Sequence, residues 1–190
     1  IPSFLESLDT SRPYRTSSPC GGEVGNDPNR GNWHGGAWFP TYLGDHRNWR
    51  EIIEQQNGLF VSEFYAQGSP EMDSLRKFIP DDKIFAPDNE IWEYHNKDNP
   101  HSGRTDGMSH QQILMDMTHR MMGDFADTEQ FAAYSGILQG EFLKGEIEHH
   151  RREKWRISGS LYWMFNDCWP SVGWSLIDYY GKPKPAYYYA

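Results

Sequence analysis

The chain has 190 residues, a formal net charge of −9, 15% aromatic residues and two cysteines. This length suffices for one domain with a real core. The acidic balance without a Lys/Arg-rich tract argues against nucleic-acid binding, and no apolar run reaches the roughly 20 residues of a membrane-spanning helix. Cys20 and Cys168 form no metal motif and no disulfide framework, so we expect two free thiols, with a disulfide between them as the alternative.

The first third of the chain predicts two helices separated by a strand and a long loop. Residues 1–9 are typical of the end of a helix, and residues 12–19 have a short strand-like centre. Residues 20–40 are rich in Gly, Asn, Asp, Pro and Trp, which predicts a long irregular loop of the kind that is often functional. Asp45 is placed to cap a helix over residues 46–57.

The middle of the chain predicts a strand followed by mostly polar connections. Residues 59–64 form a nearly continuous apolar run, which favours a strand buried on both faces of a parallel sheet. Ser69 and Pro70 are expected to open a short helix. Residues 80–107 are polar and rich in Asp and Asn, which predicts a loop.

The last part predicts two helices and a second strand. Ser109 and Gln112 have the spacing of a capping box. Thr128 is expected to cap a longer helix, whose last residues His149 and His150 we place on a solvated face. Residues 157–167 predict a strand, and this alternation of strands and helices indicates a parallel α/β architecture.

Chemically distinctive residues follow the two predicted strands. Glu63 ends the first, and Trp163, Asn166 and Asp167 end the second. In α/β barrels the carboxyl ends of the strands form the active face. A carboxylate beside aromatic residues suits glycoside hydrolysis, although a structural carboxylate at a strand end is the alternative for Glu63.

Four segments carry a family resemblance. The stretches "RPYRTSSP", "WHGG", "FVSEF" and "GSLYWMFNDCWPSVGWSLIDYYGKPKPAYYY" together resemble glycoside hydrolase family 2, most closely its β-mannosidase branch. The resemblance covers nearly the whole chain with order and spacing kept. It implies a partial (β/α)8 TIM barrel in which residues 1–190 supply about strands five to eight, with long βα loops. The first half-barrel and the family's β-sandwich domains would be absent.

The resemblance also implies roles for particular residues. The Glu of the "SEF" motif is the family's nucleophile in a retaining mechanism, which assigns that role to Glu63. Trp163 would be a sugar platform, against a core Trp as the alternative. Trp33 and His34 would line the pocket, although a Trp-His-Gly-Gly turn can instead be a structural corner. Asn166 and Asp167 would bond sugar hydroxyls or brace their loop, and we favour bracing.

The second catalytic carboxylate is not expected in this chain. The family's general acid/base is a Glu of an Asn-Glu pair that precedes the "RPY…SSP" segment. Asn89-Glu90 follows Glu63, so its order is wrong and we interpret it as a lookalike. The run "NDPNRGNWHGG" also lacks an aromatic residue and a His that often precede "WHGG" in the family.

These inferences define the expected function. The parent protein would be a retaining exo-β-glycosidase, most consistent with a β-mannosidase, and this chain alone would be inactive. β-Glucosaminides, β-galactosides and β-glucuronides remain alternative substrates, with "NDCWP" favouring mannosides and glucosaminides. A non-catalytic carbohydrate-binding module is the alternative from another class.

The expected partners follow from the same reading. We expect a carbohydrate substrate, no metal and no organic cofactor. A half-barrel has exposed strand edges, so the rest of the parent polypeptide or self-association would have to cover them. The chain begins at Ile1 without a signal-like segment, which we interpret as a piece of something longer. A glycan-degrading parent would favour a periplasmic or secreted location.

Overall fold

The computed structural model describes residues 1–96 and 108–190, and the part of the predicted polar loop at 97–107 lies outside them. The strands are β1 (Asn32–His34), β2 (Phe60–Phe64) and β3 (Ser160–Tyr162). The helices are α1 (Pro2–Leu8), α2 (Trp38–Leu43), α3 (Trp49–Glu54), α4 (Met72–Leu75), α5 (Asp81–Ile84), α6 (Glu90–His95), α7 (His110–Met122) and α8 (Thr128–Arg152), with 3-10 turns η1 (His46–Asn48) and η2 (Pro185–Tyr189).

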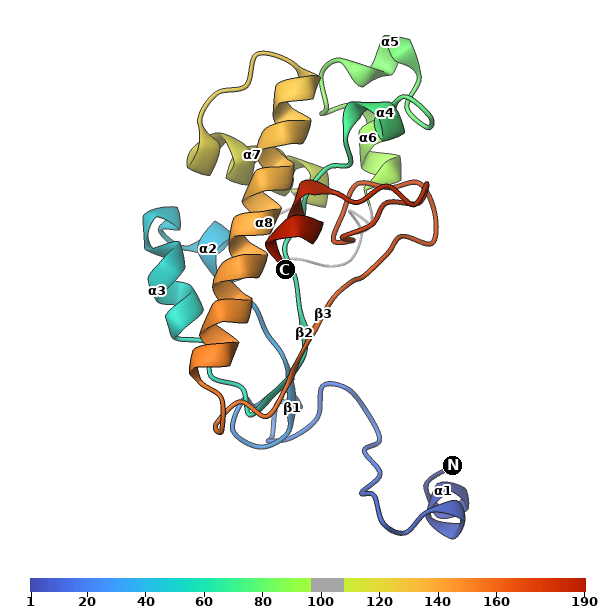
Figure 1. Cartoon of the computed structure of the whole chain (residues 1–190), viewed down its shortest axis with the longest axis vertical. Helices are drawn as coiled ribbons and strands as arrows, with labels where there is room; N and C mark the ends of the chain where they lie inside the picture. Colours follow the sequence, from blue (N-terminus) through green and yellow to red (C-terminus); the bar gives the residue numbers. More distant parts are fainter. Residues whose placement is uncertain (97–107) are drawn as a thin grey trace.

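The strands form a small parallel sheet in the order β1-β2-β3. Helices α2 and α3 lie in the connection from β1 to β2, and helices α4 to α8 lie in the connection from β2 to β3. Parallel neighbours need such crossovers, which confirms the expected α/β class. Figure 1 shows α8 running beside the sheet, with α4 to α7 gathered beyond the carboxyl ends of the strands.

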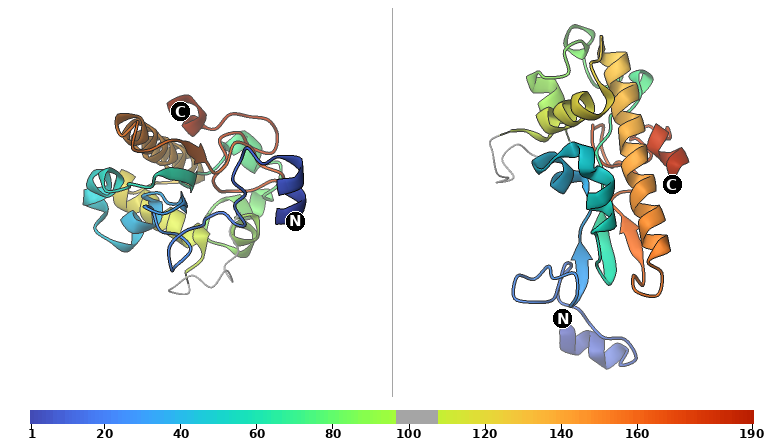
Figure 2. Two further views of the ribbon diagram at one scale, coloured as in Figure 1. Left: turned by 90° about the horizontal axis from the view of Figure 1, so that it is seen from below. Right: turned by 90° about the vertical axis from the view of Figure 1, so that its left-hand side faces the viewer.

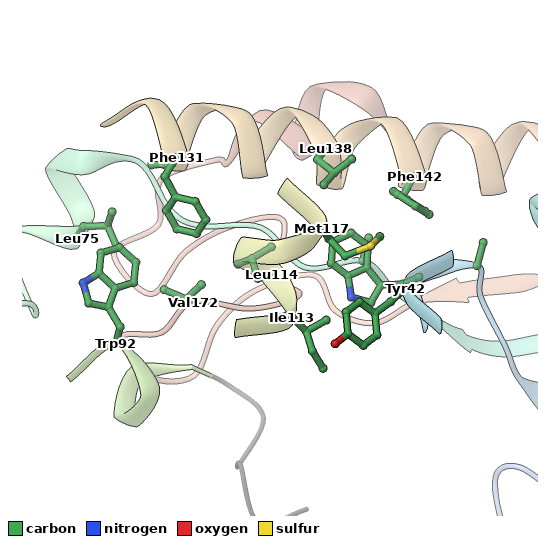
Figure 3. Packing of buried hydrophobic residues seen from close by; sticks show 14 of the residues in the cluster. Tyr42, Leu75, Trp92, Ile113, Leu114, Met117, Phe131, Leu138, Phe142 and Val172 are labelled. Atoms are coloured by element: carbon green, nitrogen blue, oxygen red, sulfur yellow. The ribbon is translucent and has the colours of Figure 1, made fainter. Parts of the chain in front are cut away.

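Helix α8 organises two hydrophobic clusters. The larger cluster joins α8 to α7 and α6, where Phe131 and Trp92 pack edge to face with ring centroids 5.9 Å apart (Figure 3). The smaller cluster joins α8 to the sheet, with Leu143 packed against Val61 and Phe64. The face of the sheet toward α8 is therefore buried.

The opposite sheet face is open, which corrects one prediction. Leu59 and Phe60 of the apolar run are 39% and 36% exposed, whereas Val61 and Phe64 are buried. The run was expected to be buried on both faces. Only the face toward α8 has a cover among the described residues, so apolar composition alone misjudged the burial of the other face.

The amino-terminal segment also differs from expectation. Helix α1 forms as predicted but buries none of its residues. It lies at the end of an extended stretch, away from the rest of the fold (Figure 2). Residues 12–19 form no strand. A strand needs a neighbour with which to exchange backbone hydrogen bonds, and these residues have none in the described structure.

The predicted helix starts are largely correct. Asp45 accepts a hydrogen bond from the amide of Arg47 at the start of η1, and Ser109 with Gln112 forms the predicted capping box of α7. Helix α8 is capped by Asp127 instead of Thr128, because the Thr128 hydroxyl donates to the Ile84 carbonyl at 2.8 Å.

Several predicted element boundaries were wrong. Strand β1 and the start of α2 lie within the loop predicted over residues 20–40, and α4 begins at Met72 instead of at Ser69 and Pro70. Within the predicted polar loop, α5 and α6 form short helices that bury Ile84 and Trp92. Tertiary packing of these two apolar side chains outweighs the polar local composition. The strand predicted over residues 157–167 is limited to Ser160–Tyr162, although Trp163 still donates to the Phe64 carbonyl and Asn166 forms an isolated bridge with Ile177.

Candidate active site

Glu63 lies one residue before the carboxyl end of β2, at the edge where the chemistry was expected. Its backbone carbonyl accepts a hydrogen bond from the amide of Gly35 at 2.9 Å, and β1 pairs His34 opposite it. The carboxylate oxygen Oε2 lies 3.7 Å from His34 Nδ1, with both side chains about seven-tenths buried. The sheet register therefore brings the "WHGG" and "SEF" motifs into direct contact.

The backbone of His34 is held by a single side chain from the preceding loop. Asn26 Oδ1 accepts from the His34 amide at 2.9 Å, and Asn26 Nδ2 donates to the His34 carbonyl at 2.9 Å. This pair of hydrogen bonds resembles the backbone pairing that a neighbouring strand would make at the edge of β1. The loop that precedes β1 thus fixes part of the site.

A pocket of about 500 Å³ opens beside Glu63 and His34. Aromatic side chains form much of its wall: Trp33, Trp38, Phe39 and Tyr65. The aromatic rings of such a pocket can stack on the apolar face of a sugar, while the carboxylate reacts at the anomeric carbon of that sugar. Glu63, Trp33 and His34, three of the predicted site residues, therefore share one cavity.

The Trp-His-Gly-Gly turn is both a corner and a pocket wall. A Cβ on Gly35 would lie 2.0 Å from the Trp33 ring, and one on Gly58 would lie 2.5 Å from it. Gly36 has φ +115°, a conformation that favours glycine. The two readings of this motif are thus compatible, because the glycines make the space in which the Trp33 ring is held.

A buried carboxylate that the motifs did not indicate supports this corner from behind. Glu146 of α8 accepts a hydrogen bond from the Ala37 amide at 2.5 Å, and its other oxygen has no hydrogen-bond partner among the described residues. Burial raises the pKa of Glu146 to about 8, against the opposing effect of the Ala37 hydrogen bond. Glu146 is therefore largely protonated at neutral pH.

The neighbouring histidines are buried, which corrects the prediction of a solvated helix face. His149 and His150 are 4% and 5% exposed, and the His150 ring packs edge to face on Phe64. Burial, followed by the charge of His149, lowers the pKa of His150 to about 4. The helix turns His150 toward the sheet, a direction that the helical pattern of "EIEHH" could have indicated together with Leu143, whereas His149 donates to the Gln56 carbonyl before β2.

Trp163 follows β3 and lies beside the end of β2, outside the walls of the pocket. Its amide donates to the Phe64 carbonyl at 2.9 Å, and its side chain is 44% exposed. The peptide bond between Trp163 and Met164 is cis. Tyr162 packs toward α8, so alternation along the strand directs Trp163 to the open face of the sheet.

Asn166 and Asp167 lie in the loop after β3. The buried Asp167 accepts from the Ser175 hydroxyl at 2.6 Å, and its amide donates to the Ile177 carbonyl at 3.0 Å. Asn166 is exposed and donates to the Asp167 carbonyl at 3.2 Å. The hydrogen bonds of Asp167 join the two sides of this loop, and neither residue lines the pocket at Glu63.

Asn89 and Glu90 have local structural partners. Asn89 caps α6 by accepting from the amides of Ile91 and Trp92, and Glu90 pairs with Lys83 at 3.0 Å. These contacts agree with the interpretation of the pair as a lookalike. Cys20 and Cys168 form no disulfide with each other, as expected.

Two features are absent from the described ranges 1–96 and 108–190. No cluster of three or more His, Cys, Asp or Glu side chains has the arrangement of a metal site. Within the same ranges, no helix combines the length and apolarity that crossing a bilayer requires.

Comparison with known proteins tests the family resemblance of the sequence motifs. No protein-family model matches the chain. The curated Beta-mannosidase B of Aspergillus flavus is 28% identical over 194 aligned residues, which cover 99% of this chain and 21% of that protein. Beta-mannosidase B of Aspergillus niger matches with the same identity and coverage. The chain thus spans about a fifth of the length of these curated relatives.

Solved structures agree with the sequence matches. The beta-D-mannosidase of Dictyoglomus thermophilum is 36% identical with a TM-score of 0.82, over 99% of this chain and 22% of that chain. The exo-chitosanase CsxA of Amycolatopsis orientalis is 26% identical with a TM-score of 0.55, over 68% of this chain and 15% of that chain. These matches support the resemblance seen in the motifs: the chain is similar, along nearly its whole length, to a segment of known β-mannosidases.

Proposed function

We propose that this chain is the C-terminal part of the catalytic barrel of a retaining exo-β-mannosidase, with Glu63 as the nucleophile. The observation that carries the proposal is the position of Glu63 at the carboxyl end of a parallel strand, in an aromatic pocket of about 500 Å³. Similarity to β-mannosidases over nearly the whole chain supports the substrate class.

The proposed mechanism uses Glu63 as one of two carboxyl groups. Its carboxylate attacks the anomeric carbon of a terminal β-mannoside and forms a covalent glycosyl-enzyme, while the leaving oxygen takes a proton from a general acid. The same acid, now a base, then activates the water that releases mannose. Strand β2 holds Glu63 in position, which near-attack geometry requires.

The acid/base carboxylate is proposed to lie outside this chain. Glu146 is directed at the backbone of Ala37, and Glu90 is paired with Lys83 away from the pocket. The parent barrel would supply the missing group from its first four strands. On this proposal β1, β2 and β3 belong to the strand-five-to-eight half.

A trapping experiment in the parent polypeptide tests the nucleophile. A 2-deoxy-2-fluoro-β-mannosyl fluoride forms a slowly hydrolysed glycosyl-enzyme, and peptide mapping should find the label on Glu63. Glu63→Gln should lower kcat for an aryl β-mannoside on the order of 10⁴-fold or more, because the attacking group is lost, while sugar binding persists.

Glu90→Gln is the matched control, since it changes the other candidate carboxylate of the sequence. Its turnover should equal that of the wild type. A label on a different residue, or wild-type turnover in Glu63→Gln, would contradict the proposal.

A β-glucosaminide is the second candidate substrate. The CsxA structure similar to this chain at 26% identity is also described as an exo-beta-D-glucosaminidase, with a TM-score of 0.54. Comparing kcat/KM for aryl β-mannoside and aryl β-glucosaminide separates the two substrates. A preference for the glucosaminide would replace the sugar in the proposal and leave the role of Glu63 intact.

A further inference from the structure

We propose that Ser18 is a positioning residue that sets the orientation of His34, and through it that of the Glu63 carboxylate. The inference rests on the proposed function and adds a residue to it. Ser18 belongs to the "RPYRTSSP" segment, to which the proposed mechanism gives no role. Its side chain nevertheless contacts the residue that faces Glu63.

The imidazole of His34 spans the distance between Ser18 and Glu63. The Ser18 hydroxyl oxygen lies 3.0 Å from Nε2, and the Glu63 oxygen Oε2 lies 3.7 Å from Nδ1. A neutral imidazole carries one N–H and has one acceptor nitrogen. If Nε2 accepts the Ser18 proton, the N–H is at Nδ1 and points toward the carboxylate.

The Ser18 hydroxyl is itself held in place. The Asn32 amide donates to the Ser18 oxygen at 2.9 Å, which leaves the hydroxyl proton for an acceptor. Two acceptors are within reach, His34 Nε2 at 3.0 Å and the Ser62 hydroxyl at 3.1 Å. Ser62 can direct its own proton to the Trp33 carbonyl at 3.3 Å, so the network is satisfied with Ser18 bonded to either one.

Charge decides between the two hydrogen-bond arrangements. With the Ser18 proton on Ser62, a neutral His34 would use Nε2–H as the donor to Ser18. The bare Nδ1 lone pair would then face the Glu63 carboxylate, which is unfavourable. With the Ser18 proton on His34, Nδ1–H faces the carboxylate instead, and this attraction favours one ring orientation.

The consequence for the proposed reaction is a carboxylate held in one orientation. A distance of 3.7 Å exceeds that of a direct hydrogen bond, and catalytic contacts of this kind commonly tighten only in the substrate complex. The order serine, histidine, carboxylate resembles that of a serine hydrolase. Here the serine oxygen accepts the Asn32 amide, so we assign it a holding role instead of a nucleophilic one.

Three variants of the parent polypeptide test this role. Ser18→Ala removes the hydroxyl and should lower kcat by about 10- to 100-fold with KM nearly unchanged, by analogy with the loss on removing the hydrogen-bond partner of a metal-bound His. Ser18→Thr keeps a hydroxyl at the same place and should restore most of the lost kcat. Ser17→Ala is the matched control, because the Ser17 hydroxyl donates to the Pro19 carbonyl at 2.9 Å and should leave kcat at the wild-type value.

A purely structural role for this segment would give a different pattern. Wild-type kcat in Ser18→Ala would overturn the inference. So would equal losses in Ser17→Ala and Ser18→Ala, or a Ser18→Thr protein as slow as Ser18→Ala. Equal melting temperatures for the variants and the wild type would show that each one folds, as expected for an exposed serine.

Fluorosugar labelling separates this inference from the proposed function. If the wild type is not labelled on Glu63, the proposed function fails and the role of Ser18 fails with it. If Glu63 is labelled, and Ser18→Ala is labelled at the wild-type rate, only the role of Ser18 fails. Slower labelling of Glu63 in Ser18→Ala, with rescue by Ser18→Thr, is the expected result.

Discussion

At the residue scale, the site depends on side chains that are buried behind it as well as on those that face the pocket. His34 and Glu63 line the cavity, while Glu146 holds the Ala37 amide at the back of the same corner. A carboxyl group in this position is costly when ionised, because burial removes its hydration. The stability of the corner should therefore depend on pH.

Replacing Glu146 by Gln should make stability less dependent on pH. Burial raises the pKa of Glu146 from the ordinary 4.5 to about 8. Between these values the folded state retains a proton that the unfolded state releases, so the stabilisation declines as pH rises through this range. The amide of Glu146→Gln can still accept from Ala37 but does not titrate. The melting temperature of the variant relative to wild type should therefore rise between about pH 7 and about pH 9.

The histidine beside Glu146 titrates in a different range and can be separated from it. Burial lowers the pKa of His150 to about 4, so its effect is a loss of stability as pH falls below the ordinary value of 6.5. Measurements above pH 7 thus report on Glu146. Glu148→Gln, which changes an exposed carboxylate two residues along α8, should show no such trend. An unchanged difference for Glu146→Gln across this pH range would contradict the assignment.

At the element scale, α8 is the helix on which the sheet, α7 and the C-terminal turn all pack. Glycines in α8 permit the closest of these approaches. A Cβ on Gly140 would lie 2.7 Å from the Tyr189 ring, and one on Gly136 would lie 2.9 Å from Pro185. Glycine is the weakest ordinary helix former, so its use here indicates that packing of η2 outweighs helix propensity.

Gly140→Ala should destabilise the protein despite the gain in helix propensity. The new methyl group meets rigid ring atoms of Tyr189, and overpacking of this kind costs about 1–3 kcal/mol, against a gain of about 1 kcal/mol from propensity. Denaturant unfolding should show a lower free energy of unfolding. In Gly145→Ala the nearest atom is the flexible Ile53 Cδ1 at 2.9 Å, so this control should change stability much less. Equal effects at the two positions would refute the close approach of η2.

At the scale of the whole molecule, the sheet presents an apolar face that nothing in the described chain covers. Leu161 and Phe165 are 56% and 60% exposed, and Trp163 lies between them. Strands β1 and β3 are the edges of the described sheet. Exposed apolar faces and unpaired strand edges favour association, so this face is where the rest of a barrel or a second copy would pack.

The isolated 190-residue chain should therefore associate and should not hydrolyse an aryl β-mannoside. Leu161→Asp places a charge on the open face and should shift the size distribution in sedimentation velocity toward monomer. Leu43→Asp changes another exposed leucine, at the end of α2, and should leave the distribution unchanged. The prediction would be wrong if the isolated chain hydrolysed the substrate and Glu63→Gln abolished this turnover. The chain would then need no catalytic carboxylate from outside residues 1–190.

Local sequence features predicted much of the fold correctly. The capping box at Ser109 and the helix start at Asp45 depend on neighbours within four residues, so pattern and propensity suffice. The strand that ends near Glu63 was also predicted correctly, because a run of apolar residues with high β propensity favours a strand in many packing environments. The motifs around these elements then indicated the related family, which the comparisons support.

The errors arose where burial depends on distant parts of the chain. His149 and His150 were predicted to be solvated, yet both are buried, His150 against Phe64 and His149 against the backbone of Gln56. The strand over residues 12–19 lacked a neighbour with which to pair, and the apolar run at Leu59 lacked a cover on one face. In each case the residue's own preference was real, but the fold decides which partners are present.

The sequence by itself determined that a carboxylate, Glu63, ends a parallel strand and belongs to a glycosidase-like motif. Only the tertiary structure decided what surrounds that carboxylate. Ser18, His34 and Glu63 come from three separate segments, and strand pairing between β1 and β2 brings the last two into register. Glu146 reaches the same corner from α8, more than 100 residues farther along than Ala37. Contacts between such distant segments follow from packing of the whole chain, which no local pattern encodes.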